Sequence, residues 1–188
     1  IPPSSFSCLN DAEVIFNPSA SNETTGKHSY RKSLVSQQSA RCVAGYIYAA
    51  AGNGESTTDL IFAGSSMIAE NGSILAEGER FSFESKITIA DIDVERLRND
   101  RLRNKSFTHS KYHSLENLQY QYITIYQNVT HKKYSPSFLG KKSSGEKELF
   151  FLDRYISPMP FVPANDDKLN ERCEEIFSMQ VGGLAKRL

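Results

Sequence analysis

Three successive stretches decide the fold of this 188-residue chain: EVIF at residues 13–16, KHSYRKSLVSQQS at 27–39 and CVAGYIYAAA at 42–51. The first and third are short apolar runs, and Asn17-Pro18 closes the first, so both are typical of buried strands. In the middle stretch Tyr30 and Leu34 lie four positions apart among basic and amide residues, which predicts an amphipathic helix with these two on its apolar face. A strand, a helix and a strand in this order predict parallel pairing through a right-handed crossover.

The residues that follow predict an antiparallel portion of the same sheet. Short apolar runs at 67–69 and 74–76 are joined by Glu70-Asn71-Gly72-Ser73, and Asn-Gly accepts the positive φ angles of a type I′ hairpin. Two further apolar segments, at 60–62 and 86–93, also read as strands. The sequence therefore predicts an α/β fold with a mixed sheet.

The second half of the chain contains fewer regular patterns. Residues 94–105 predict a helix whose apolar stripe is Val94, Leu97 and Leu102, and residues 120–126 predict a two-faced strand or arm. The proline-rich residues 157–163 predict an extended connector. Asn165 or Asp166 is expected to cap a final helix. Its apolar positions run to the last residue, at Leu169, Cys173, Ile176, Leu184 and Leu188. Because this helix has no stop signal and the chain opens on a double proline, we expect an excised piece of a longer protein.

Charge and composition argue against two classes of partner. The chain has 22 Lys plus Arg and 22 Asp plus Glu, which leaves a net charge of zero and no surplus to attract nucleic acid or an anionic membrane. A hydrophobic content of 39% is typical of a chain that folds. No apolar run is long enough to cross a bilayer and no signal peptide is seen, so a cytoplasmic location is expected.

Neither the cysteines nor the histidines form a recognisable site. Cys8, Cys42 and Cys173 are widely spaced and odd in number, so we expect three reduced thiols, with Cys42 and Cys173 in the core. His109 and His113 have the i, i+4 spacing of some metal sites, but no third ligand is evident, so no metal is expected. The residues alone predict a globular α/β domain without a catalytic motif.

Several stretches resemble a known family. These are PPS at 2–4, NPSAS at 17–21, YIYAAAGNGESTTD at 46–59, MIAENG at 67–72 and LAEGERF at 75–81. Together they closely resemble the glutaminase domain of bacterial glutamine-dependent NAD⁺ synthetases, a branch of the nitrilase superfamily. The resemblance continues through residues 90–98 and returns at 161–163 and 172–188.

The resemblance implies a fold and a division of the chain. The fold is half of a nitrilase-superfamily α-β-β-α sandwich with a mixed sheet and an Asn-Gly hairpin, followed by an extended linker and a terminal helix. Residues 1–105 would be the C-terminal half of the glutaminase domain and residues 106–163 an extension and linker. Residues 164–188 would be the first helix of a synthetase domain.

The family's activity has two stages. A Glu-Lys-Cys triad hydrolyses glutamine, and the ammonia reaches an ATP-dependent domain that amidates nicotinic acid adenine dinucleotide. In the family the catalytic Cys stands in a Cys-Glu-Asp segment a few residues before Pro2, and the triad's Glu and Lys come earlier. We therefore expect no catalytic residue and no cofactor in this chain, and no activity from it alone. ATP and Mg²⁺ are expected in the synthetase domain.

The resemblance also implies binding residues and partners. Ser21 matches a serine that contacts the amino-acid end of glutamine, and Lys27 stands where relatives have an arginine. Alternatively, Ser21 caps the following helix and Lys27 is solvated. Glu55, Ser56 and Thr57 are expected to border the pocket, because they follow a central strand. The expected partners are L-glutamine, the remainder of the enzyme and further copies of the chain.

Two other interpretations remain open. One is another nitrilase-superfamily amidase. The other is a non-catalytic assembly module, in which residues 96–105 and an arm at residues 120–129 dock onto other subunits.

Overall fold

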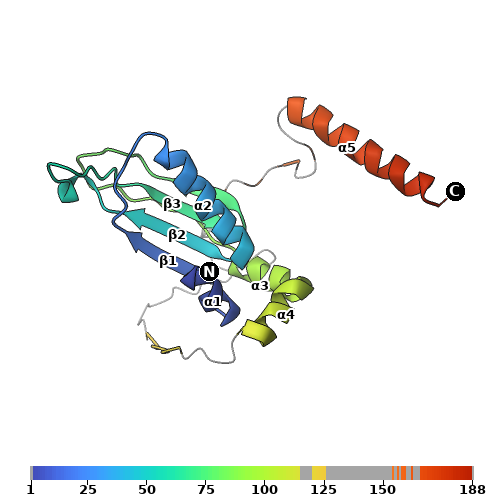
Figure 1. The fold of residues 1–188 in the computed structure, drawn as a ribbon, viewed down its shortest axis with the longest axis horizontal. Helices are drawn as coiled ribbons and strands as arrows, with labels where there is room; N and C mark the ends of the chain where they lie inside the picture. Colours follow the sequence, from blue (N-terminus) through green and yellow to red (C-terminus); the bar gives the residue numbers. More distant parts are fainter. Residues whose placement is uncertain are drawn as a thin grey trace, which may run out of the picture. The chain divides into compact units, whose positions relative to one another are not determined.

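The structure is a computed structural model that describes residues 2–114, 120–125, 154, 156, 158, 159, 162 and 166–187. The chain divides into two compact units, Ile1–Asp153 and Arg154–Leu188. The first unit contains a sheet and its surrounding helices, and the second contains one long helix (Figure 1).

Unit 1 is built on a four-stranded mixed sheet in the order β1-β2-β3-β4. Its strands are β1 (Val14–Ser19), β2 (Gly45–Ala50), β3 (Ser66–Glu70) and β4 (Ser73–Glu77). β1 and β2 pair in parallel, and the other two pairings are antiparallel. The predicted parallel pairing and the predicted hairpin are both confirmed, and the turn has the expected positive φ angles of 44° at Asn71 and 90° at Gly72.

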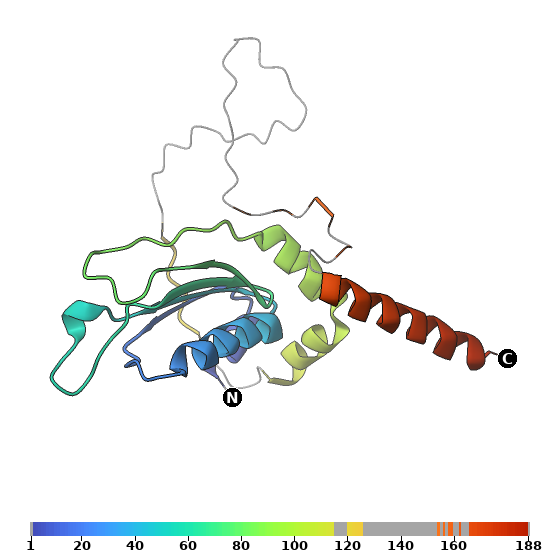
Figure 2. The same ribbon diagram turned by 90° about the horizontal axis from the view of Figure 1, so that it is seen from above.

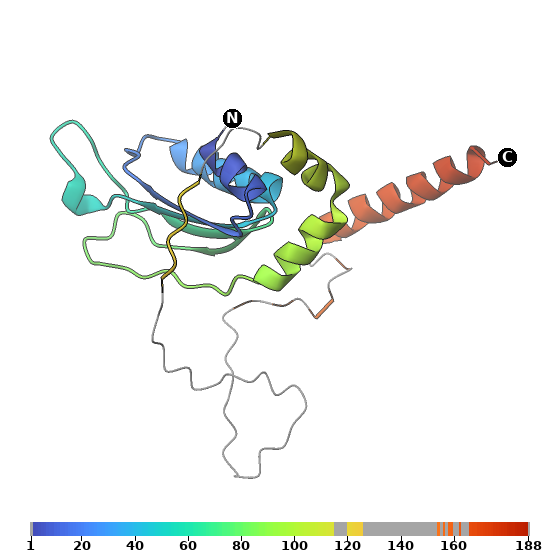
Figure 3. The same ribbon diagram turned by 90° about the horizontal axis from the view of Figure 1, so that it is seen from below.

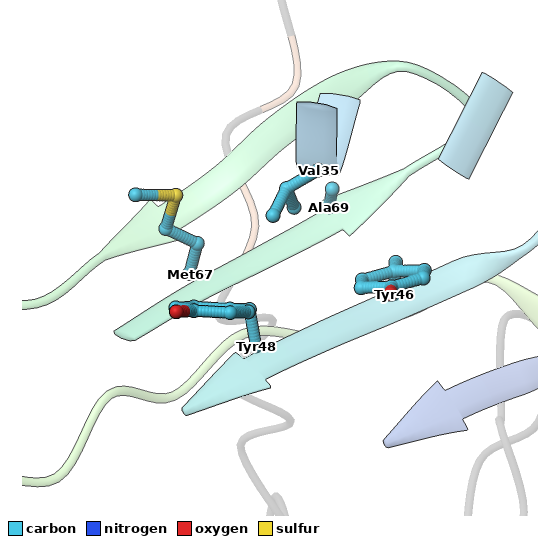
Figure 4. Close-up of a cluster of buried hydrophobic side chains, with 5 residues drawn as sticks. All are labelled: Val35, Tyr46, Tyr48, Met67 and Ala69. Atoms are coloured by element: carbon cyan, nitrogen blue, oxygen red, sulfur yellow. The ribbon is translucent and has the colours of Figure 1, made fainter. Parts of the chain in front are cut away.

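Helix α2 (Lys27–Cys42) joins β1 to β2 and covers one face of the sheet (Figure 2). Beneath it lies a cluster of buried side chains from α2, β2 and β3 (Figure 4). The cluster consists of Val35, Tyr46, Tyr48, Met67 and Ala69. The helix is confirmed, but the prediction of its apolar face is wrong.

The buried residues of α2 are Arg31, Val35, Ser39 and Cys42, whereas Tyr30 and Leu34 are exposed. Two of the buried residues are polar, and each has a partner of its own. The Ser39 hydroxyl donates to the Ala44 carbonyl at 2.7 Å, and Arg31 pairs with Glu23. A pattern based on apolar residues alone therefore selects the wrong side of this helix.

The opposite face of the sheet is covered unevenly. The Ile92 side chain packs over Gly45 on this face. A Cβ atom added to Gly45 would lie 2.9 Å from the Ile92 Cδ1 atom. On β1, by contrast, Phe16 is 72% exposed, and its register neighbour Ile47 is only partly buried. The structure thus has one sheet face covered by a helix and a second face that is partly open along β1.

Three of the predicted strands are not formed. Residues 60–62 belong to a loop closed by side chains, residues 86–93 have no regular structure, and neither do residues 120–125. The 86–93 segment makes side-chain contacts with β3 in place of a strand ladder, including a 2.7 Å hydrogen bond between the Thr88 and Ser66 hydroxyls. Residues 126–153 lie outside the described residues.

Helix α3 (Val94–Arg103) begins where the Asp93 carboxylate accepts a hydrogen bond from the Arg96 N–H at 2.9 Å. Leu97 is buried as predicted, but Leu102 is 80% exposed and Arg101 is buried in its place. Arg101 follows Leu97 by four residues and so shares its face. The helix was predicted for residues 94–105, but α3 ends two residues earlier, at Arg103. A separate helix, α4 (Lys105–Ser114), follows it.

A short helix, α1 (Pro3–Leu9), precedes β1 and packs beside α2 and α4 (Figure 3). Its one buried residue is Cys8, and Cys42 is buried too. Both are free thiols, as the sequence predicts.

Unit 2 consists of α5 (Asp166–Ala185) and a few described residues before it. The final helix is confirmed, but it ends at Ala185 and does not reach the last residue. The prediction that Cys173 is a core residue is wrong for the described residues, where this thiol is exposed on α5. Most of the predicted connector at 157–163 lies outside the described residues. Across the part of the chain that is described, none of the helices combines the length and apolar character needed to span a membrane.

Candidate substrate-binding site

Two loops meet at the carboxyl ends of the parallel strands β1 and β2 (Figure 1). The first, residues 20–26, leads from β1 to α2. The second, residues 51–65, leads from β2 to β3 and contains the short helix η1 (Asn53–Glu55). Backbone hydrogen bonds join them, from the Glu23 N–H to the Ile61 carbonyl at 2.7 Å and from the Ala51 N–H to the Ser19 carbonyl at 2.8 Å. This edge is the place where open α/β sheets bind ligands.

Lys27 closes the first loop. Its ammonium group donates to the backbone carbonyl of Asn22 at 2.6 Å and to the Asn22 side-chain oxygen at 2.9 Å. An ammonium group has three N–H bonds, so the described residues engage two of them and leave one for a further acceptor.

Ser21 lies in the same loop, half-buried. Its hydroxyl makes no hydrogen bond to any residue that the structure describes. The alternative interpretation of this residue as a helix cap is wrong, because the N-cap of α2 is Gly26 and no side chain caps it. The structure therefore places Ser21 in the first loop and Lys27 directly after it, at the start of α2, each with unused capacity for hydrogen bonding.

A buried ion pair, which was not predicted from the sequence, joins this loop to α2. A guanidinium nitrogen of Arg31 lies 2.7 Å from the Glu23 carboxylate. Arg31 also donates to the Ser65 hydroxyl at 3.2 Å and stands 5.9 Å from the centre of the Tyr48 ring. No local motif indicates such a pair, because Glu23 lies in a loop and Arg31 on a helix whose apolar pattern points elsewhere.

Two polar atoms in this cluster lack partners. Among the described residues, the Oε1 atom of Glu23 and the hydroxyl of Tyr48 are buried without a hydrogen bond. The nearest cation to that oxygen besides Arg31 is Arg80, at 3.9 Å. Glu23 thus holds its Arg31 partner tightly and keeps one oxygen available for a further donor.

The three residues expected to border the pocket have local roles in the second loop. The Ser56 hydroxyl accepts from the Phe62 N–H at 3.0 Å, and the Thr57 hydroxyl accepts from the Leu60 N–H at 3.2 Å. These bonds replace a strand ladder at residues 60–62. Glu55 is exposed. The two loops are joined at the Glu23–Ile61 bond, and among the described residues these three make no hydrogen bond to Ser21 or Lys27.

A separate pocket of about 800 Å³ lies between the start of β1, α3 and α4. Its charged walls are paired internally, since Arg98 bonds Glu13 and the Lys111 ammonium lies 2.5 Å from the Asp11 carboxylate. None of the predicted site residues lines it. In the described part of the chain, no three His, Cys, Asp or Glu side chains gather where they could hold a metal ion.

Residues 7–102, just over half of the chain, match the model of the family described as carbon-nitrogen hydrolase. The chain therefore belongs to the carbon-nitrogen hydrolase family.

Several proteins similar to this chain share the name glutamine-dependent NAD(+) synthetase. Over all 188 residues, the chain is 39% identical to the glutamine-dependent NAD(+) synthetase of Mycobacterium tuberculosis and 37% identical to that of Mycobacterium leprae. It spans 26% and 25% of the lengths of these two proteins. A crystal structure of a glutamine-dependent NAD(+) synthetase from Cytophaga hutchinsonii is 32% identical, covering 44% of this chain and 14% of that one, with a TM-score of 0.41.

Proposed function

We propose that this chain is part of a glutamine-dependent NAD⁺ synthetase and contributes one side of its glutamine-binding site. The observation that carries the proposal is the full-length similarity, at 39% identity, to proteins of that name. Residues 1–105 are the proposed C-terminal half of the glutaminase domain, residues 106–163 the linker and residues 164–188 the start of the synthetase domain. The chain by itself is proposed to be inactive, because the Glu-Lys-Cys triad lies in no part of it.

The first loop supplies the proposed contacts to glutamine. The third N–H of Lys27 donates to the substrate carboxylate, and the Ser21 hydroxyl bonds either the carboxylate or the amino group. Because an ammonium group is a point charge, Lys27 binds the carboxylate through one bond and not through the two-pronged geometry of an arginine. Glu55, Ser56 and Thr57 are proposed to shape the rim of this pocket.

The second stage belongs to the synthetase part of the proposed enzyme. There ATP and Mg²⁺ would activate the acid that ammonia then converts to the amide of NAD⁺. No Mg²⁺ ligand is assigned in this chain, since the described residues form no suitable cluster. A cytoplasmic homo-oligomer is part of the same proposal, and the open sheet face along β1 supports a requirement for further packing partners.

The nitrogen source provides the test. The protein expressed from its complete reading frame should form NAD⁺ from nicotinic acid adenine dinucleotide and ATP with either glutamine or ammonium. Ser21→Ala and Lys27→Met should raise KM for glutamine by about tenfold or more, as expected for the loss of one charge-assisted hydrogen bond. Both variants should leave the ammonium-dependent rate unchanged.

Matched controls are Ser33→Ala and Lys86→Met, which alter exposed residues away from the loop. Equal loss of both activities in the Ser21 and Lys27 variants would contradict the proposed role in binding. No NAD⁺ formation from either nitrogen source would contradict the proposed enzyme and favour another amidase or an assembly module.

A further inference from the structure

Two of the three cysteines of the chain lie against each other inside unit 1. Cys8 comes from α1 and Cys42 from the last position of α2. With Ala44 they form a small buried cluster, and Ala12 and Ile15 pack against it. The two free thiols therefore share one buried site before any reaction takes place, and each shifts the pKa of the other, as expected for neighbouring groups.

Hydrogen-bond donors surround the Cys42 sulfur. The Gln38 side-chain amide donates to it at 3.2 Å, and the Cys42 thiol itself faces the Ser4 carbonyl at 3.9 Å. The Arg101 guanidinium is held beside the pair, because it donates to the Cys42 carbonyl at 3.1 Å and to the Val43 carbonyl at 2.9 Å. Donors and a fixed positive charge favour a thiolate over a thiol.

The two sulfurs therefore differ in acidity. Interaction with the Cys8 thiol is the largest cause that lowers the pKa of Cys42. The same interaction and burial raise the pKa of Cys8. The Gln38 donor at the Cys42 sulfur and the Arg101 charge held beside it favour Cys42 as the nucleophile of the pair.

We propose that Cys8 and Cys42 form an oxidisable dithiol, which a small two-electron oxidant of the hydrogen peroxide class converts to a disulfide between α1 and α2. This inference does not depend on the proposed function. A small oxidant reaches the pair when α1 opens locally, since α1 has only seven residues and Cys8 is its one buried side chain. The side-chain contacts from Gln38 to Ser4 and Ser5, each 2.9 Å, hold α1 against α2 between openings.

The reaction balances in two steps. First, the Cys42 thiolate attacks one peroxide oxygen, the O–O bond breaks, and hydroxide leaves and takes up the proton that Cys42 released. Next, the Cys8 sulfur attacks the resulting Cys42 sulfenic acid, the S–S bond forms, and the S–O bond breaks. The hydroxyl group departs as water with the Cys8 proton. Two thiols are oxidised by two electrons, and one peroxide is reduced to two waters.

The test is a peptide map of the purified protein after treatment with hydrogen peroxide. We expect the mass of two hydrogens to be lost, a Cys8–Cys42 linked peptide to appear, and dithiothreitol to reverse both changes. The matched control is Cys173→Ala, which removes the exposed thiol of unit 2 and should give the same linked peptide. In Cys8→Ala, the Cys42 sulfenic acid has no resolving thiol, so it should be trapped by dimedone.

Two results would overturn the proposal. One is a protein in which peroxide oxidises Cys173 while Cys8 and Cys42 are both recovered as thiols. The other is a map in which either residue is linked only to Cys173. If Cys8→Ala does not fold, Cys8→Ser replaces it, and the map of the unsubstituted protein still decides the question.

Discussion

Glu23 and Arg31 form an ion pair at 2.7 Å in which the two side chains are only 7% and 6% exposed. The pair joins the loop after β1 to the helix that covers the sheet. Two charges removed from water are stable only when they satisfy each other, so this contact restricts the loop that carries Ser21 and leads into Lys27. The proposed substrate-binding loop is therefore fixed by two contacts, the Glu23–Arg31 ion pair to α2 and the Glu23–Ile61 backbone bond to the second loop.

Removal of one partner of this pair should be strongly destabilising. Glu23→Ala leaves the Arg31 charge buried without its carboxylate, and the free energy of unfolding should fall by about 3 kcal/mol. The free energy of unfolding is measured by urea unfolding followed by circular dichroism. The control is Glu79→Ala, which breaks the 3.4 Å pair with Lys86. Because the Glu79 side chain is largely exposed, this change should cost less than about 1 kcal/mol. Equal losses in the two variants would contradict the structural role of the buried pair.

A second buried cation, Arg101, joins α3 to the rest of unit 1. Its guanidinium donates to the carbonyls of Ala12, Cys42 and Val43 at 2.6, 3.1 and 2.9 Å. Arg101→Met leaves these oxygens unpaired, and the free energy of unfolding should fall by about 3 kcal/mol in the same urea experiment. Arg103→Met, on the exposed side of the same helix, is the control. A tolerated Arg101→Met alongside a damaging Arg103→Met would show that the face of α3 is assigned wrongly.

The β3–β4 turn should not accept a side chain at Gly72. This residue has a φ of 90°, and an added Cβ would lie 3.1 Å from the Ala40 Cβ atom. Gly72→Ala should therefore lower the free energy of unfolding by about 1–2 kcal/mol, measured by thermal or urea unfolding. Gly54→Ala is the matched control, because nothing lies within 4 Å of its added Cβ, and it should have little effect. A Gly72→Ala protein as stable as the control would rule out the positive-φ turn.

Stability should depend on the ionisation of Glu77 in acid. Hydrogen bonding from the Lys32 ammonium, 2.6 Å away, is the main cause that lowers the pKa of Glu77, and His28 adds to it. A lowered folded-state pKa gives a contribution that is complete above the ordinary value of 4.5 and is lost as the pH falls through the folded value. Glu77→Gln should therefore reduce stability at pH 7 and flatten the decline of stability below pH 4.5. Unfolding midpoints measured from pH 7 to below pH 4.5 give this pH dependence of stability. If the stability of Glu77→Gln declines as steeply as that of the unsubstituted protein, Glu77 is excluded as a contributor.

Local sequence patterns were sufficient to predict the structure wherever neighbouring residues determine the backbone conformation. Asn71-Gly72 specifies its hairpin because both residues accept positive φ. The apolar runs around Ile15 and Tyr46 specify strands, and the intervening helix requires them to pair in parallel. The resemblance to glutamine-dependent NAD⁺ synthetases could also be recognised from sequence, since it depends on stretches of identical residues and not on their positions in space.

Only the folded chain decides which polar side chains are buried and what they contact. Arg31 and Arg101 are buried because oxygen atoms from distant segments surround them, so a pattern based on hydrophobicity selects Tyr30, Leu34 and Leu102 in their place. Residues 60–62 look like a strand, but the hydroxyls of Ser56 and Thr57 accept the backbone N–H groups of Phe62 and Leu60. A periodic pattern records how apolar a residue is, whereas the burial of a charge depends on acceptors that another part of the chain provides.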